Sequence, residues 1–212
     1  MPNVTKMISK YRQVAQAKAE LKKTQEIWKK RICDNITVRT PDEEFNTMMN
    51  VWVKYQLYIC NLWSRSPSYY HEGSGGRGFR DSCQDSESIV SINPDLTRKR
   101  ILQLAALIRK DGTCAPGWAD TTGSGKHRPN KDHQIWLTAT VSAYIKETGD
   151  KDILFEYAPY LKDHWIRGWD IDANWKGGAI SDGEGTVFEH LEKNLNFCFN
   201  DVGPKGLPLI GH

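Results

Sequence analysis

The sequence predicts an all-α fold, and three of its features lead to this class. Apolar residues recur every three to four positions in several stretches, which is the spacing of helices that bury one face. The alternation of apolar and polar residues that marks strands is scarce. Polar, glycine-rich connections separate the helical stretches. Antiparallel helices with long loops at one end are typical of an α/α hairpin barrel, although the helices expected here are too few to close one.

The first expected helix is strongly basic. Residues 1–33 carry nine Lys or Arg and two Glu, a local charge of +7, whereas the rest of the chain, with 20 basic and 24 acidic side chains, carries −4. A basic amphipathic helix can contact nucleic acid or a membrane surface. An apolar stripe favours the alternative, a helix docked on the body of the protein. The stripe consists of Met7, Tyr11, Val14, Ala17, Leu21, Trp28 and Ile32.

A second helix is expected over residues 43–64. Thr40-Pro41-Asp42-Glu43 predicts its start, with the proline in the first turn. Its surface is apolar almost all round, which predicts burial on more than one side. The apolar positions are Phe45, Met48, Met49, Trp52, Tyr55, Ile59 and Trp63.

Four further helices follow, the last two of them short. Asp111-Gly112 and Gly149 predict where the first two end. The connections between the helices are long for a compact domain, and such loops are usually functional. The helices are expected over residues 97–109, 132–148, 151–164 and 185–200, and the long connections lie at 66–80, 111–131 and 166–184.

The most informative tract is Gly-Ser-Gly-Gly-Arg-Gly-Phe-Arg-Asp-Ser-Cys-Gln-Asp at residues 73–85, which follows Tyr69, Tyr70 and His71. Its four glycines let the backbone approach a ligand closely. Planar guanidinium groups and acceptor-only carboxylates suit a ligand that carries many hydroxyls, and the aromatic side chains add flat apolar faces. The tract therefore predicts a sugar-binding loop rather than a phosphate cradle.

Other interpretations of single motifs carry less weight. Gly73, Gly75 and Gly78 match GxGxxG, but no strand precedes them, which argues against dinucleotide binding. Asp81 and Asp85 share a helix face if a helix begins by Asp81; the alternative is a helix cap and a surface charge, and the neighbouring arginines favour a built site.

Two more groups of side chains have both a functional and a structural interpretation. His127, Asp132 and His133 could ligate a metal, although a polar loop followed by a helix start is favoured. The indoles of Trp165, Trp169 and Trp175 could stack on sugar rings or fill the core of a loop, and these alternatives stay open.

The cysteines and the hydropathy restrict the environment. The five cysteines are scattered without a CxxC pair, which favours reduced thiols and a cytoplasmic location. No apolar run approaches the ~20 residues that span a membrane, and nothing resembles a signal peptide. We therefore expect no membrane partner.

The sequence GGRGFRDSCQD resembles the sugar-binding signature of glycoside hydrolase family 94, the inverting disaccharide phosphorylases. Residues 10–33 are similar to the helical linker that precedes the barrel in this family. Further similar blocks follow in the family's order: Val38–Asp42 through Trp52, Tyr55, Gln56, Cys60 and Leu62–Ser66; Asp132–Leu137 with Ala143–Asp150; and Thr186–His190 with Gly206–Gly211.

The resemblance implies a partial α/α six-hairpin barrel preceded by a linker helix. Residues 1–36 would form the helical linker, and residues 37–212 the N-terminal part of the catalytic barrel, which would be incomplete. The family's general acid lies in an Asp-Trp-Asn-Asp-like motif that would fall just beyond His212. We therefore assign no catalytic residue within the chain and expect no phosphorolysis by the chain alone.

The resemblance also implies which residues bind the substrate. Arg77 and Asp81 match family residues that hydrogen-bond the non-reducing sugar, with the Arg77 match weakened by a different spacing in the family motif. Arg80, Gln84 and Asp85 match the same motif, either as direct contacts or as support. By the same comparison, Asp132 is expected to start a helix or support the site rather than act as the acid.

The chemistry implied is phosphorolysis of a β-linked, cellobiose-like disaccharide to an α-sugar 1-phosphate and a free sugar. No metal and no organic cofactor are needed, and inorganic phosphate is the co-substrate. The expected partners are a disaccharide or oligosaccharide and phosphate, not nucleic acid, together with a homodimer in the full-length enzyme. The alternatives are an inverting glycoside hydrolase, a sugar transferase with a similar barrel, and a sugar-binding remnant without catalysis.

Overall fold

The computed structural model describes residues 4–63, 76–119, 124–126, 132–162, 174–175, 181–207 and 209. By its contacts the chain divides into two units, residues 1–56 and residues 57–212. Each unit is described by itself. The division of the chain into a linker over 1–36 and a barrel domain over 37–212 stays a prediction.

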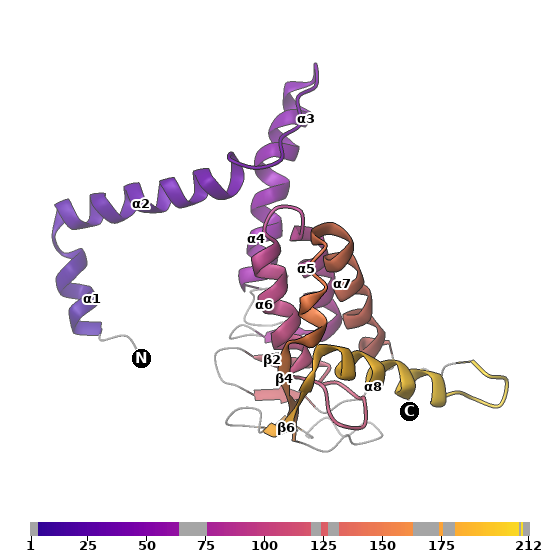
Figure 1. The fold of residues 1–212 in the computed structure, drawn as a ribbon. Coiled ribbons are helices and arrows are strands. Elements are labelled where there is room, and N and C mark those ends of the chain that lie inside the picture. The colour runs from indigo at the N-terminus through magenta and orange to yellow at the C-terminus, as the bar shows by residue number, and fades with distance from the viewer. Residues whose placement is uncertain are drawn as a thin grey trace. The chain divides into compact units, whose positions relative to one another are not determined.

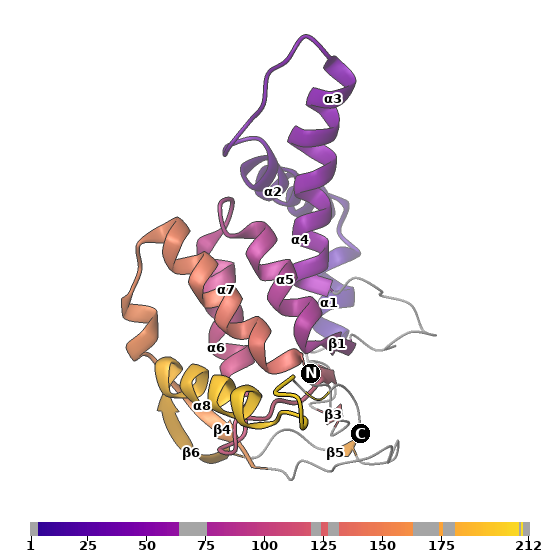
Figure 2. The same ribbon diagram turned by 90° about the vertical axis from the view of Figure 1, so that its right-hand side faces the viewer.

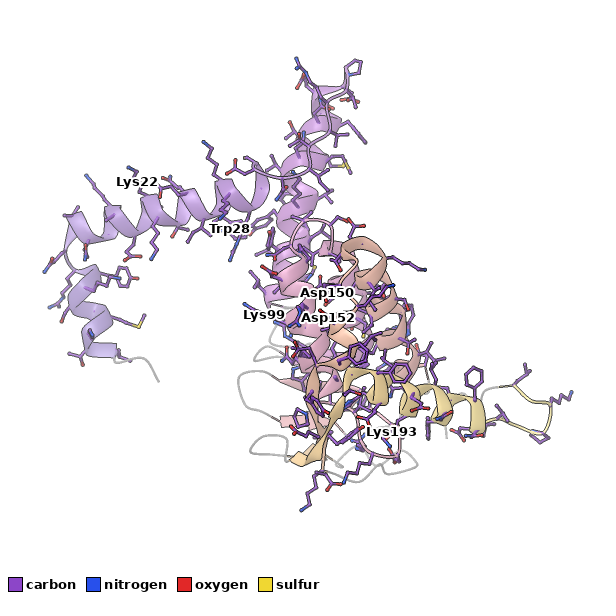
Figure 3. The ribbon with its side chains drawn as sticks, in the orientation of Figure 1. Lys22, Trp28, Lys99, Asp150, Asp152 and Lys193 are labelled. Carbon is purple, nitrogen blue, oxygen red and sulfur yellow. The ribbon has the colours of Figure 1, made fainter. Side chains whose placement is uncertain are left out.

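The first unit begins with helices α1 (Val4–Tyr11) and α2 (Val14–Ile32) (Figure 1). Lys22 and Trp28 lie on opposite sides of α2, as expected for an amphipathic helix (Figure 3). Trp28 packs against Tyr55, with 5.3 Å between ring centroids, and the buried Lys54 donates to the Ile32 carbonyl at 2.8 Å. These contacts attach the end of α2 to the following helix.

The helix predicted over residues 43–64 is present as α3 (Glu43–Thr47), the π-helical η1 (Met48–Val53) and α4 (Lys54–Trp63). Asp42 is its N-cap and accepts from the Phe45 amide at 2.9 Å. Pro41 therefore precedes the cap, and its predicted place in the first turn is wrong. Within residues 1–56 much of the apolar surface is exposed, at Phe45, Met48, Val51 and Trp52.

Two asparagines on this helix hold the extended segment in front of it. The side-chain amide of Asn46 exchanges two hydrogen bonds of 2.8 Å with the backbone of Thr40. Asn50 does the same with Val38, also at 2.8 Å. Each amide thus replaces the partner that a neighbouring strand would supply, since it offers one donor and one acceptor.

The second unit is built around four helices, α5 (Phe79–Ile89), α6 (Pro94–Ala105), α7 (His133–Thr148) and α8 (Val187–Asn200). The first three lie side by side and α8 crosses one end of them (Figures 1 and 2). Their apolar faces form one core, whose fully buried members include Phe79, Ile101, Leu104 and Leu137. The all-α class predicted from the sequence is confirmed.

Local sequence explains where these helices begin and end. Gly149 closes α7 with φ 74°, a left-handed conformation that favours glycine, as predicted. Thr186 and Glu189 form a capping box at the start of α8. α6 begins three residues before the predicted start, because Asn93 caps it and accepts from the Leu96 amide at 3.1 Å.

Short strands occupy parts of the chain that the sequence did not mark as strands. The helix predicted over 151–164 is wrong: a 3₁₀ turn η2 (Asp152–Phe155) leads into strand β4 (Tyr157–Leu161), which pairs antiparallel with β6 (Ser181–Thr186). Pro159 explains the difference, since proline disrupts a helix interior. A second sheet has the order β1-β2-β3-β5. Its strands are β1 (Gly76–Gly78), β2 (Gly117–Ala119), β3 (Ser124–Lys126) and β5 (Asn174–Trp175).

The chemistry of the cysteines and the hydropathy of the helices agree with the sequence. All five cysteines lie in the described part of the chain and are free thiols. Burial raises the pKa of the Cys83 and Cys114 thiols, so neither is a reactive thiolate. No helix among the described residues is both long enough and apolar enough to cross a membrane.

A polar network joins the start of α6 to the end of α7. Asp150 (Figure 3) accepts from the Tyr144 hydroxyl at 2.7 Å and from Arg98 Nε at 3.4 Å, while Arg98 also pairs with Glu156 at 2.6 Å. The hydrogen bond from Tyr144 is the largest influence on Asp150 and lowers its pKa, although partial burial opposes it.

We expect Asp150→Asn to destabilise the protein by about 1 kcal/mol at pH 7, the typical value of one hydrogen bond. Because the pKa of Asp150 is lowered by folding, its contribution is complete above the unfolded-state pKa of about 4 and disappears as the pH falls through the folded-state value. Urea denaturation of both proteins from pH 7 to pH 2 measures this. Asp152→Asn is the control, because it changes an exposed carboxylate two residues along the chain. A difference in the free energy of unfolding between Asp150→Asn and the unchanged protein that stays constant with pH would contradict the prediction.

Candidate functional site

The candidate site lies where β1 leads into α5. Gly78 is the N-cap of α5, with φ −83° and ψ 142°. Phe79 anchors the turn: its side chain is fully buried and its amide donates to the Pro116 carbonyl at 3.0 Å. With Phe79 fixed in the core, Arg80 and Asp81 occupy the first turn of the helix, where a carboxylate is stabilised by the helix dipole.

The five residues predicted to bind the sugar lie in two different settings. Arg80 is exposed, and Asp81 and Gln84 are half-buried, so all three reach the surface within the first turns of α5. Arg77 and Asp85 are buried, with 6% and 8% exposure. Because α5 begins at Phe79, Asp81 and Asp85 do lie one turn apart on a helix face. The contact of these five residues with a sugar stays a prediction.

Arg77 binds the end of α4 within the second unit. Its two terminal nitrogens donate to the carbonyls of Asn61, at 3.1 Å, and Leu62, at 2.6 Å. Arg100 from α6 adds a bond of 2.7 Å to the Asn61 carbonyl, and the Asn61 amide donates to the Asp85 carbonyl at 2.6 Å. Two buried cations therefore complement the negative end of a helix dipole. The sequence offered no local signal for Arg100, which lies 39 residues from Asn61.

Arg80 reaches from α5 to the start of α7. Its NH1 donates to Asp132 Oδ2 at 2.9 Å, and the Trp136 indole donates to the same oxygen at 3.2 Å. Partial burial acts to raise the pKa of Asp132, but these two hydrogen bonds and the nearby charges outweigh it, and the pKa lies below its ordinary value. Asp132 is the N-cap of α7, in agreement with the predicted helix start. Its pairing with Arg80, 52 residues away, was not visible in the sequence.

His133 packs under the site. Its ring stacks on Phe79, with 6.5 Å between centroids and 16° between planes, and burial lowers its pKa, which favours the neutral ring. Among the residues that the structure describes, no three His, Cys, Asp or Glu are grouped as metal ligands. Several predicted groups fall outside the described residues: Tyr69, Tyr70, His71, His127, Trp165, Trp169 and the side chain of Trp175.

Gly78 allows a close approach that a larger residue would prevent. A Cβ added at this position would lie 2.5 Å from Asp81 Oδ2 and 3.2 Å from its Cγ. The backbone angles of Gly78 suit any residue. Only the carboxylate of Asp81 would have to move, so a substitution here tests the placement of that carboxylate separately from the fold.

We expect Gly78→Ala to change the free energy of unfolding by less than about 1 kcal/mol, because only the Asp81 carboxylate has to move. If Asp81 contacts a sugar as predicted, the same substitution weakens the binding of that sugar severalfold. Chemical-shift titration and urea denaturation measure the two effects. In an Asp81→Ala background the same substitution should cause no further loss of affinity. Unchanged affinity in the Gly78→Ala protein would show that the position of the carboxylate does not matter.

The site groups a guanidinium, carboxylates and an amide at neighbouring helix starts of a helical-hairpin protein. Such a set can donate to and accept from several hydroxyls at once. A family model described as "Glycosyl hydrolase 94 superfamily, catalytic domain" matches residues 27–212, which is most of the chain. The chain belongs to this superfamily, and its helical fold is part of the (α/α)₆ catalytic domain.

Relatives with known roles support the same assignment. The chain is 34% identical over 175 residues to the cyclic β-(1,2)-glucan synthase NdvB of Rhizobium meliloti (strain 1021). The aligned region covers 82% of this chain and 6% of NdvB. It is 28% identical over 232 residues to the N,N′-diacetylchitobiose phosphorylase of Vibrio furnissii, over 97% of this chain and 26% of the relative. It is 31% identical over 183 residues to the solabiose phosphorylase of Paenibacillus borealis, over 85% of this chain and 20% of the relative.

The chain is thus related to disaccharide phosphorylases and spans about a quarter or less of the length of these relatives. The resemblance stated from the sequence is confirmed at the level of the family. The sugar that is bound and the reaction that follows are separate questions.

Proposed function

We propose that this chain supplies part of the pocket for the non-reducing sugar in an inverting disaccharide phosphorylase. The observation that carries this is the start of α5, where Arg80, Asp81 and Gln84 reach the surface together over a buried Phe79. Charge-assisted hydrogen bonds from a guanidinium and to a carboxylate are the strong contacts available to a neutral, hydroxyl-rich ligand. The family membership of residues 27–212 supports the same function.

In the proposed reaction, a phosphate oxygen attacks the anomeric carbon while the glycosidic bond breaks on the opposite face. The leaving oxygen takes its proton from a general acid, which we assign to no residue of this chain. Phosphate is already an anion, so it needs no general base, in contrast to the water of an inverting hydrolase. The products are an α-sugar 1-phosphate and a free sugar. Asp81 and Arg80 would hold the sugar that is transferred.

The similarity to a β-glucan synthase favours a second candidate for the donor. NdvB is named as a synthase of cyclic β-(1,2)-glucan, and by this similarity the proposed donor is a β-(1,2)-linked oligosaccharide rather than a disaccharide. The sugar pocket is the same in both cases. A panel of cellobiose, N,N′-diacetylchitobiose and a β-(1,2)-linked oligosaccharide separates the two candidates.

Direct binding tests the pocket. D-glucose, N-acetyl-D-glucosamine and the acyclic polyol sorbitol are titrated into the isotope-labelled 212-residue chain, and amide chemical shifts are recorded. We expect saturable shifts at the start of α5 with one of the two ring sugars and none with sorbitol. No shift with either ring sugar, or equal shifts with sorbitol, would contradict the proposal that the start of α5 forms a sugar pocket.

A chimera tests the chemistry. Residues 27–212 replace the matching segment of the Vibrio furnissii N,N′-diacetylchitobiose phosphorylase, and the purified protein is called the chimeric phosphorylase below. We expect phosphate-dependent release of an α-sugar 1-phosphate from one member of the panel. Cleavage of the same substrate by water, without phosphate, would support the hydrolase alternative instead. Circular dichroism and thermal unfolding show whether the chimera is folded.

A further inference from the structure

The carboxylate of Asp132 is bonded to two side chains, one of them on a neighbouring helix, rather than to the backbone of its own helix. As the N-cap of α7, Asp132 is placed to accept an amide of the first turn, yet its side chain makes no capping bond. Oδ2 instead accepts from Arg80 NH1 on α5 and from the Trp136 indole, one turn into α7. Trp136 therefore fixes the carboxylate from within α7, and the carboxylate holds the guanidinium of Arg80.

The two helix starts are joined beneath this pair. Phe79, fully buried, stacks on His133, which is 9% exposed. α5 and α7 pack side by side (Figure 2). The separation of Arg80 and Asp132 is therefore set by the packing of two helices, although both side chains are about half exposed, at 47% and 52%.

We propose that Asp132 is a positioning residue for Arg80 in the sugar pocket. The role rests on the proposed function, because it matters only if Arg80 contacts the sugar. A free arginine side chain loses rotamer entropy when it is fixed, and a side chain that is already held loses less of it on binding. Within the described residues the guanidinium uses one nitrogen on Asp132, which leaves its other N–H groups for hydroxyls.

The surrounding charges fit this role. The charged or titratable groups that act on Asp132 are Arg80 from α5 and its neighbour His133, and His133 in turn lies near Asp81. Burial lowers the pKa of His133, which favours the neutral ring and weakens its attraction to Asp132 Oδ1, 4.0 Å from Nε2.

The test measures the affinity of the 212-residue chain for the ring sugar that it binds, D-glucose or N-acetyl-D-glucosamine, and the mobility of Arg80 Nε by ¹⁵N relaxation. Asp132→Asn keeps the shape of the side chain and removes its charge. We expect it to raise the Kd about three- to tenfold, in line with the loss of one exposed ion pair and of side-chain order, and to increase the mobility of Arg80. Asp132→Glu should restore part of the affinity. In an Arg80→Ala background, Asp132→Asn should cause no further loss.

Asp182→Asn is the matched control, because it removes a carboxylate of similar exposure, 46%, from an ion pair of 3.4 Å with Lys110 outside the site; it should leave the affinity unchanged. A normal affinity in Asp132→Asn, or an equal loss in the Arg80→Ala background, would overturn the positioning role while the proposed function stands. A chain that binds no sugar even without substitutions overturns the proposed function, and the role of Asp132 falls with it.

Discussion

Asp81→Ala is expected to lower the kcat/KM of the chimeric phosphorylase roughly a hundredfold or more, an effect typical of a lost contact to the reacting group in the transition state. The carboxylate lies in the first turn of α5, next to Gly78, which has no side chain to displace it. In the proposed pocket it accepts hydroxyl groups of the sugar that is transferred. Initial rates at several concentrations of disaccharide and phosphate separate kcat from KM.

Asp95→Ala is the matched control for Asp81→Ala. Asp95 also stands in the first turn of a helix, α6, and is exposed outside the site. Both substitutions remove a favourable helix-dipole interaction of about 0.3–1 kcal/mol, so any difference in rate belongs to the sugar contact. A near-normal rate in the Asp81→Ala protein would show that Asp81 does not contact the transferred sugar.

Arg77→Ala is expected to destabilise the 212-residue chain by about 2–4 kcal/mol, because it removes a buried cation from the end of α4, together with its hydrogen bonds to the Leu62 carbonyl and to the Asn61 carbonyl, which keeps Arg100 as a donor. The residue is 6% exposed, and its guanidinium donates to the carbonyls of Asn61 and Leu62. Urea denaturation gives the free energy of unfolding. Sugar affinity measured on the folded protein shows whether Arg77 also contacts the ligand, as the family resemblance implied.

Arg80→Ala, three residues further along, is compared with Arg77→Ala in stability and in sugar affinity. Its exposed ion pair with Asp132 contributes about 0–1 kcal/mol to stability, so we expect little destabilisation and a clear loss of sugar affinity. The two arginines would then have separate roles, Arg77 in the fold and Arg80 in the pocket. Equal stability of the Arg77→Ala and Arg80→Ala proteins would contradict this division.

Much of the helical fold could be predicted, because residues close together in the sequence determine where these helices lie and end. Gly149 ended α7 as expected, and the apolar spacing placed α8 and the long helix before Trp63. The strands were not visible, since β1, β2, β3 and β5 are only two or three residues long and are defined by pairing with distant segments. A run of three residues carries no readable alternation.

In the candidate site, too, the residues that are neighbours in the sequence could be predicted and the contacts between distant residues could not. Arg80, Asp81 and Gln84 were found from one contiguous tract, because neighbouring residues on a helix start act together. The support of the site could not be found in this way: Arg100 lies 39 residues from Asn61, and Asp132 lies 52 residues from Arg80. Only tertiary packing brings these partners together. The buried position of Arg77 was likewise decided by its contact with α4.

The asparagine amides that hold Val38 and Thr40 affect the order in which the chain folds. They join residues only six and twelve positions apart, whereas the bond from Asn194 to the Gly112 carbonyl joins residues 82 positions apart. Closing a short loop costs less chain entropy than closing a long one, and local contacts form sooner. The asparagine-held turn can therefore assemble while the chain is still being synthesised, long before α8 is available to complete the core.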